Sequence, residues 1–156
     1  MFWFSDGIIA WPGIQVSPET NVGWIPAVLE NTLSVARLSW HPSERGVELC
    51  GVASGGVLRW CRLMLDETTT TLVVLANHSA VCDGGYRAAA LVGPGHIAGV
   101  TASGIHWLRP AGKYLTAYAT TAVSLPEPVA AFPSPLTGEV LIVCQDGSLE
   151  RVTVPS

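Results

Sequence analysis

A short apolar stretch, a small or polar residue followed by glycine, and a second apolar stretch recur four times along the chain. The copies read FWFSDGIIAW around Gly7, CGVASGGVLRW around Gly55, GVTASGIHWL around Gly104 and IVCQDGSLERV around Gly147. The glycines follow one another at intervals of 48, 49 and 43 residues. Asp-Gly and Ser-Gly supply the positive φ values of a tight turn, and the flanking β-branched and aromatic residues favour paired strands. The pattern therefore predicts four β-hairpins.

Further strand-like segments flank these hairpins. A segment lies ahead of each of the last three hairpins, at 35–40, 87–92 and 129–132, and another follows each of the middle two, at 68–76 and 113–125. Turns rich in proline and glycine separate the leading segment from its hairpin, at 41–46, 93–95 and 133–138. No segment has a sustained helical period. Each unit is thus expected to be a four-stranded antiparallel meander, with almost no helix in the chain.

Four-stranded units at this period are typical of a β-propeller. We expect an all-β fold in which residues 1–156 form a single, partial propeller domain of about three to four blades. The predicted strands make two whole blades and two partial ones, whereas propellers close with about 4–8 blades. An uncovered blade exposes an apolar face and unpaired strand edges. Three explanations stay open: a fragment of a longer product, self-association that completes a ring, or a second chain that supplies blades.

Composition and charge argue against some classes of binding partner. The net charge is −4 with eight lysines and arginines spread along the chain, so no basic stripe favours nucleic acid. The N-terminal MFWFSDGIIAW lacks a basic flank, and Asp6-Gly7 interrupts its apolar run, which argues against a signal peptide or a membrane span. We expect a cytoplasmic protein with no membrane partner. Its four cysteines lack CxxC spacing and are interpreted as reduced thiols, with Cys50, Cys61 and Cys144 in the core.

The sequence carries no motif that points to catalysis. It has no GxSxG elbow, no GxxxxGK[ST] loop and no GxGxxG that opens a helix. Its four histidines lack metal-ligand spacing, and Glu44 and Glu48 are interpreted as flanking a turn, so we expect no metal, no cofactor and no enzyme activity. The alternative is a fragment of a propeller enzyme such as a quinone-dependent dehydrogenase.

The last unit resembles a known family. LPEPVAAFPSPLTGEVLIVCQDGSLERVTVP at 125–155 resembles the repeats of bacterial β-propeller proteins encoded beside MoxR-type AAA+ ATPases and von Willebrand A proteins. The resemblance implies a WD40-like scaffold of the MoxR, von Willebrand A and β-propeller ternary system, with those two proteins as partners and no catalytic residues. The Trp-Asp landmark of eukaryotic WD40 repeats is missing from the chain.

Candidate protein-binding residues lie in the predicted turns. The hairpin turns contribute Asp6, Ser54, Ser103 and Asp146 to a rim, and the stretch 77–85, interpreted as a connection between blades, contributes His78 and Asp83. An ordinary polar loop is the competing interpretation of 77–85.

The arginines and tryptophans are assigned roles according to their residue type. Arg37, Arg59 and Arg109 are candidate anchors for a partner, because arginine is enriched at binding hot spots. The tryptophans that recur after successive hairpin glycines, Trp11, Trp60 and Trp107, are expected to pack between blades.

Overall fold

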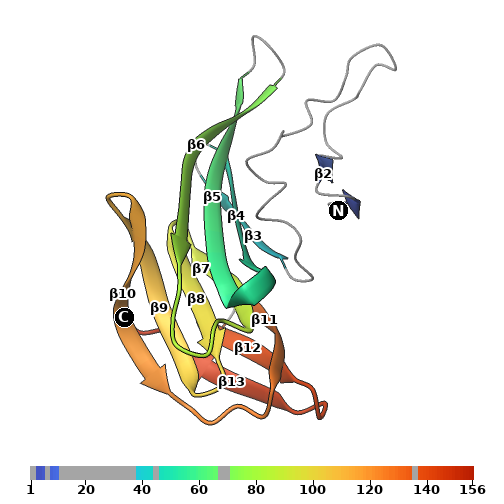
Figure 1. The fold of residues 1–156 in the computed structure, drawn as a ribbon, viewed down its shortest axis with the longest axis vertical. Coiled ribbons are helices and arrows are strands. Elements are labelled where there is room, and N and C mark those ends of the chain that lie inside the picture. Colours follow the sequence, from blue (N-terminus) through green and yellow to red (C-terminus); the bar gives the residue numbers. More distant parts are fainter. Residues whose placement is uncertain (1–2, 6–7, 11–37, 44–45, 67–70, 135–136) are drawn as a thin grey trace.

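The computed structural model describes residues 3–5, 8–10, 38–43, 46–66, 71–134 and 137–156 (Figure 1). These residues form strands and a single 3₁₀ turn, with no α-helix among them. The elements are β1 (Trp3–Ser5), β2 (Ile8–Ala10), β3 (Leu38–Ser43), β4 (Gly46–Ala53), η1 (Ser54–Gly56), β5 (Val57–Asp66), β6 (Thr71–Ala80), β7 (Ala88–Gly93), β8 (His96–Thr101), β9 (Gly104–Ala111), β10 (Tyr114–Ala122), β11 (Pro128–Ser134), β12 (Glu139–Cys144) and β13 (Leu149–Thr153).

The strands form antiparallel meanders in chain order. Sheet I contains β3 to β6, sheet II contains β7 to β10, sheet III contains β11 to β13, and β1 pairs with β2 in a hairpin. The hairpins predicted around Gly55, Gly104 and Gly147 are confirmed as the second and third strands of the three sheets. Gly55 and Gly147 have φ values of 80° and 85°, the left-handed conformation that the turns require. The all-β prediction is therefore correct, and the repeating unit is the expected meander.

Sheet II lies between sheets I and III (Figure 1). Its first strand, β7, packs against β3 and β4 on one side and against β11 on the other. The strand contains three consecutive alanines, Ala88 to Ala90, each at most 2% exposed. First strands that converge side by side leave little room between sheets, so small side chains fit there better than large ones. The alanine run thus allows the three sheets to approach closely at this end.

Both faces of sheet II are buried, with alternate residues in different cores. Ala88, Val100 and Trp107 belong to a cluster that they share with Ile142 of sheet III. Ala89, Ile97 and Leu108 belong to a second cluster, shared with Leu58 and Trp60 of sheet I. Side chains on a strand alternate between the faces, so successive residues supply separate interfaces. The predicted packing of Trp60 and Trp107 between sheets is confirmed, whereas Trp11 lies outside the described residues.

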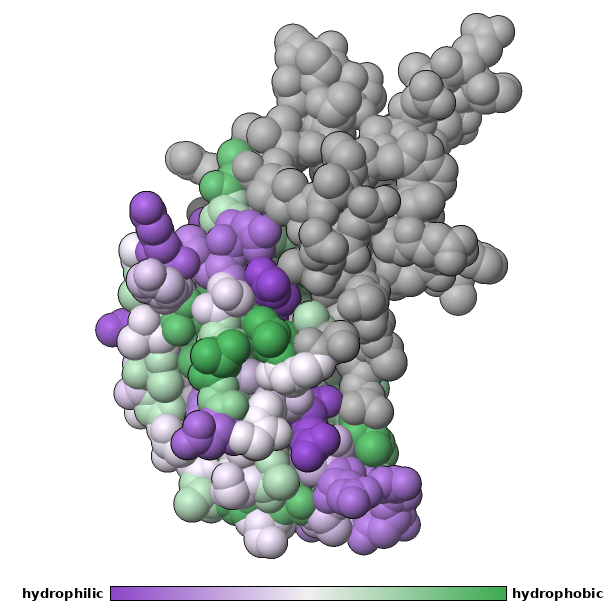
Figure 2. Space-filling model, in the orientation of Figure 1, coloured by the Kyte–Doolittle hydropathy of each residue, from purple (hydrophilic) through white to green (hydrophobic). Residues whose placement is uncertain are grey.

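Sheet III has one buried face and one half-covered face. Val140, Ile142 and Cys144 are buried toward sheet II. The opposite face carries Phe132 and Leu149, each 51% exposed. Figure 2 shows that hydrophobic residues (green) lie in groups among polar ones (purple) on one face of the described part. The buried thiols Cys50, Cys61 and Cys144 confirm the core assignment of these cysteines, and all four cysteines are free.

Several predicted turns are shorter than expected. The turn assigned to 133–138 starts only after Ser134, where β11 ends. The turn assigned to 41–46 is wrong at its start, because β3 continues through Pro42 to Ser43 and pairs with β4. The connection assigned to 77–85 is wrong over 77–80, since β6 continues to Ala80 and pairs there with β5. Cross-strand pairing overrides the local preference of the polar residues in these places. The described residues contain no helix of the length and apolarity needed to cross a membrane.

Candidate functional site

Turns from all three sheets line up at one end of the molecule, and backbone hydrogen bonds join them. We call this surface the hairpin rim and define it as residues 54–56, 81–87, 102–103, 123–127 and 145–148. The bonds that connect it run from Tyr86 N to Gly56 O (2.9 Å), Arg87 N to Val100 O (2.8 Å), Val123 N to Ser103 O (3.2 Å), Leu125 N to Ala102 O (3.2 Å) and Gln145 N to Glu127 O (2.9 Å). The hairpin turns predicted to form a rim are therefore brought together.

Two glycines close the contact between sheet I and the connection to sheet II. Gly56 and Gly85 have φ values of 75° and 72°, and a Cβ atom on Gly56 would lie 2.7 Å from the Cα atom of Gly85. No side chain fits between two backbones at that separation. Glycine is therefore required at this point of the rim, which fixes how the 81–87 connection lies on η1.

The predicted rim residues are distributed unevenly. Asp83, Ser103 and Asp146 are exposed on the hairpin rim. Ser54 opens η1 at the same end of the sheets, and Asp6 lies outside the described residues.

Two of these side chains stabilise their own turns. Asp146 Oδ1 accepts hydrogen bonds from Ser148 N (2.9 Å) and Ser148 Oγ (2.6 Å), and these bonds lower the pKa of the exposed carboxyl. Ser103 N donates to Thr101 Oγ1 at 3.2 Å, and the two hydroxyl oxygens lie 3.3 Å apart. Both residues form hydrogen bonds that stabilise their own turns. Only their remaining donors and acceptors are available to a binding partner.

His78 is not a rim residue, in contrast to its prediction. It lies on β6 directly opposite Trp60 of β5, and the two rings stack with centroids 5.5 Å apart at 6°. Its Nδ1 atom is buried and has no hydrogen-bond partner in the described part of the chain. The stacking explains why the strand continues past the polar Asn77-His78-Ser79 sequence, because an imidazole on an indole covers apolar area.

The arginine anchors also differ in position. Arg109 is exposed, and its guanidinium carbon lies 5.7 Å from the centre of the Tyr118 ring on β10. His96 packs edge-on against the same ring, with centroids 5.7 Å apart. Arg59 is half-buried on β5, and Arg37 lies outside the described residues. Arg109 is thus held by an aromatic partner at a surface position, as a recognition residue would be.

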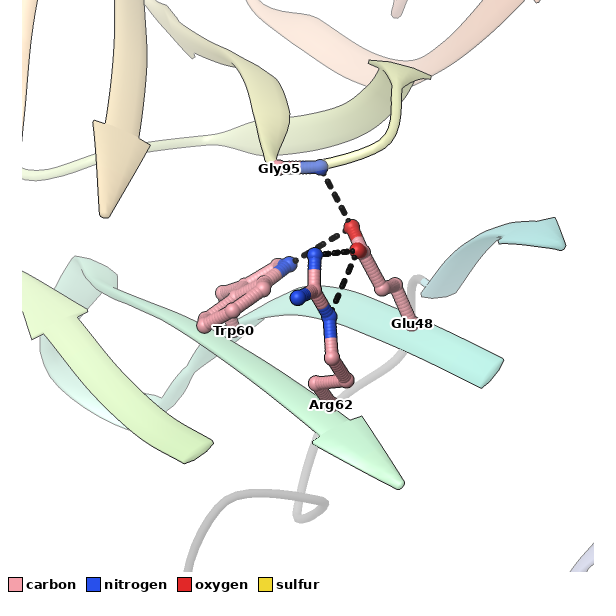
Figure 3. A network of polar contacts seen from close by, with 4 residues as sticks. All are labelled: Glu48, Trp60, Arg62 and Gly95. Carbon is pink, nitrogen blue, oxygen red and sulfur yellow. Dashed lines mark hydrogen bonds and ion pairs between the residues drawn. The ribbon is translucent and has the colours of Figure 1, made fainter. Parts of the chain in front are cut away.

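A buried carboxylate, missed by the sequence interpretation, links sheet I to sheet II (Figure 3). Glu48, assigned to a turn, instead lies on β4 with 0% exposure. Its Oε2 atom accepts from Trp60 Nε1 (3.2 Å) and from the backbone N–H of Gly95 in the β7–β8 turn (2.6 Å). Its Oε1 atom accepts from Arg62 Nε (3.0 Å) and from Arg62 Nη2.

These contacts satisfy the carboxylate and impose a geometry on its neighbours. The Arg62 guanidinium carbon lies 5.6 Å from the Trp60 ring centre, so the indole contacts a cation as well as the His78 ring. Burial, and secondarily the negative charge of Glu48, raises the pKa of the Cys61 thiol to about 12. We call Glu48 and its partners Trp60, Arg62 and Gly95 the polar lock. It favours one arrangement of the two sheets, because a buried charge is tolerated only where all its partners are present.

The sequence did contain a signal for half of this lock. Glu48 and Arg62 each lie seven residues from Gly55, so a hairpin centred on that glycine places them opposite one another. No sequence feature identifies Gly95, which belongs to another sheet. The described residues hold no group of three or more histidine, cysteine, aspartate or glutamate side chains placed to bind a metal ion.

Comparisons with known proteins support the fold. No family model matches the sequence, and no curated protein matches it. Among solved structures, the chain is similar to the β-propeller domain of Cps50 (Swd1) from Myceliophteria thermophila, with a TM-score of 0.56 and 12% identity. The match covers 78% of this chain and 40% of that domain, so the chain spans less than half of the solved propeller. The likeness identifies the fold as a β-propeller.

Proposed function

We propose that this chain is a non-catalytic β-propeller scaffold that binds other proteins through the hairpin rim. The observation that carries the proposal is the rim itself, whose turns are tied together by backbone hydrogen bonds. On it the apolar side chain of Val81 is 74% exposed, two residues from the exposed Asp83. An apolar contact surrounded by polar groups on pre-ordered loops is typical of protein-binding surfaces.

The hydrogen bonds that Glu48 and Asp146 accept within the protein favour a scaffold over an enzyme. Glu48 has both oxygens bonded, and it lies between sheets rather than at a surface that a substrate reaches. Asp146 directs an oxygen to Ser148 within its turn. A catalytic acid or base needs a proton-transfer partner within reach of substrate, which neither arrangement offers. The competing function is that of a propeller enzyme fragment, such as part of a quinone-dependent dehydrogenase.

The partners that we propose follow from the resemblance of 125–155 to the propeller repeats of the ternary system. They are a MoxR-type AAA+ ATPase and a von Willebrand A protein, rather than nucleic acid or a membrane, and the cytoplasm is the proposed location. The stretch that carries the resemblance supplies β11, β12 and β13 of sheet III, which supports its interpretation as a propeller repeat.

The test is capture of these partners by the immobilised chain. We expect it to retain a MoxR-type ATPase or a von Willebrand A protein from extracts of the native host, identified by mass spectrometry. Val81→Asp should weaken capture at least about tenfold, the effect of losing a hot-spot contact. The matched control is Lys113→Glu, an exposed charge change in the β9–β10 turn at the opposite end of the sheets.

Two results would overturn the proposal. One is equal capture by the wild-type chain and Val81→Asp, which would remove the rim from the interaction. The other is dye-linked oxidation of alcohols by the chain after addition of a quinone cofactor, which would establish the enzyme alternative.

A further inference from the structure

Two Asp-Gly bonds lie in turns of the hairpin rim. They join Asp83 to Gly84 and Asp146 to Gly147, and all four residues are exposed. A third Asp-Gly pair, at 6–7, lies outside the described residues. Glycine has no side chain to shield its nitrogen, so that nitrogen can attack the carboxyl group of an aspartate directly before it.

Such an attack converts the aspartate to isoaspartate in two steps. The glycine nitrogen bonds to the aspartate Cγ atom and loses its proton, which leaves with the carboxyl hydroxyl as water, and a succinimide ring closes. Water then adds to the main-chain carbonyl carbon of the aspartate, and the original peptide C–N bond breaks. The backbone now continues through Cβ and Cγ and is longer by one carbon. The mass is unchanged overall, and the steps need no reactant except water.

The two turns use their glycine nitrogens differently. One turn closes through Gly147 N, which donates to Cys144 O at 3.0 Å. The other closes through Gly85 N, which donates to Cys82 O at 3.1 Å. Gly84 N has no hydrogen-bond partner among the described residues. The nitrogen that has to attack is therefore held in a backbone bond at Gly147 and available at Gly84.

The two carboxyl groups differ in the same direction. Asp146 Oδ1 accepts from Ser148 N at 2.9 Å and from Ser148 Oγ at 2.6 Å, and these bonds fix the orientation of the carboxyl. They also lower its pKa, whereas ring closure needs the protonated acid. No described residue donates a hydrogen bond to the Asp83 carboxyl. Reactions slow steeply when the reacting atoms are held out of line, so Asp146 is the hindered member of the pair.

We propose that Asp83 is a site of spontaneous isomerisation to isoaspartate, and that the hydrogen bonds around Asp146 protect it from the same reaction. Both residues precede glycine, so the fold decides between them. A Cβ atom on Gly84 would meet no atom within 4 Å, which leaves room for the ring. Gly147 has the same free space, so the difference in reactivity comes from the hydrogen bonds.

Isomerisation of Asp83 changes the hairpin rim at a point that tolerates little movement. The additional carbon enters the turn that Cys82 and Gly85 close, and a Cβ atom on Gly56 would already lie 2.7 Å from Gly85 Cα. Val81, 74% exposed, directly precedes this turn. The isomerised chain therefore loses affinity for its partner, a consequence that rests on the proposed function, whereas the reaction itself does not.

Ageing of the whole chain at pH 6 tests the proposal. Trypsin places the two bonds in the peptides 63–87 and 114–151, and electron-transfer fragmentation locates isoaspartate within each. We expect isoaspartate to accumulate at Asp83 at least about tenfold faster than at Asp146, the worth of the one backbone hydrogen bond that has to open at Gly147. Equal rates, or faster isomerisation of Asp146, would overturn the proposal.

Matched controls separate the fold from the local sequence. In urea the two aspartates should isomerise at similar rates, and a tenfold difference that persists there would refute the role of the fold. Ser148→Ala removes one bond from the Asp146 carboxyl and should speed its isomerisation about threefold, with Asp83 unchanged. Asp83→Glu should leave peptide 63–87 without isomerised product at this position, because glutamate does not close the same ring. No acceleration by Ser148→Ala would contradict the protection of Asp146.

The two proposals fail separately. Partner capture by the fresh chain, together with no isoaspartate at Asp83, would contradict the modification site and leave the scaffold function intact. Isoaspartate at Asp83 with no capture of either protein would contradict the proposed partners and leave the modification site intact. Equal capture by fresh and isomerised chain would refute the loss of affinity.

Discussion

Replacement of Glu48 by glutamine removes the charge from the lock between sheets I and II while nearly keeping its volume. The carboxylate accepts four hydrogen bonds, from Trp60, from Arg62 twice and from the backbone of Gly95. A glutamine side chain keeps one acceptor oxygen and points an NH₂ group at donors on its other side. At least one buried donor is therefore left without an acceptor, and the Arg62 charge loses its partner.

The magnitude follows from the burial of the two partners. Breaking a fully buried ion pair by removing one member costs about 3–5 kcal/mol. Glu48 is fully buried, but the Arg62 side chain is 37% exposed, so water compensates part of its lost partner. We expect Glu48→Gln to lower the free energy of unfolding by about 2 kcal/mol. With a urea m-value of about 1–3 kcal/mol/M, the midpoint should fall by about 1 M.

Urea unfolding followed by tryptophan fluorescence measures this effect, because Trp60 belongs to the lock. The matched control is Glu127→Gln, at an exposed position, which should change stability by less than about 0.5 kcal/mol. A loss for Glu48→Gln as small as that of the control would refute the reasoning. A double-mutant cycle with Arg62→Gln should show a coupling of about 1 kcal/mol or more, and additive losses would equally contradict the lock.

Three further predictions concern other parts of the fold. Gly99→Ala should lower the free energy of unfolding in urea by about 1–3 kcal/mol, because a Cβ atom there would lie 2.6 Å from the buried Tyr86 ring. The control Gly93→Ala should be near neutral, since its Cβ atom would meet nothing closer than 3.9 Å. Equal losses for the two variants would contradict the packing argument. Iodoacetamide at pH 8 should alkylate Cys82 in the native state before Cys61, because Cys61 is 3% exposed and burial raises its thiol pKa to about 12. Peptide mass spectrometry measures the order, and alkylation of Cys61 before Cys82 would contradict the prediction. Asp146 has a lowered pKa, so the stability that its carboxylate contributes is fully present above the unfolded-state value of 3.8 and is lost as the pH falls through the folded value; an NMR titration of Asp146 with a midpoint at or above 3.8 would contradict this.

The sheets could be predicted from the sequence because their turns depend on local chemistry. Gly55 and Gly147 adopt positive φ values, which few other residues tolerate, so glycine marks each turn wherever it lies in space. Strand ends were less predictable. Pro42 and His78 look like turn residues, yet pairing with β4 and stacking on Trp60 keep them in strands. Contacts with a neighbouring strand decide such cases, and local sequence does not contain them.

In the candidate site, too, local features could be predicted from the sequence and contacts between sheets could not. The exposed turn positions of Asp83, Ser103 and Asp146 could be anticipated, since the turns that connect the strands of a meander lie at the surface. The lock around Glu48 could be anticipated only as far as Arg62, its partner across one hairpin. Gly95 donates from a different sheet, and that approach depends on how two sheets pack. Tertiary partners of this kind leave no periodic trace in a single sequence.

Main-chain groups, rather than side chains, join the turns of the hairpin rim to one another. Any amino acid except proline supplies the same N–H and C=O groups, so most positions there are free to mutate while the shape of the surface persists. The glycines are the exceptions, because Gly55, Gly84 and Gly147 adopt positive φ values that few other residues tolerate and the contact between Gly56 and Gly85 admits no substituent. Related chains can therefore acquire new recognition partners by exchanging surface residues on an unchanged backbone.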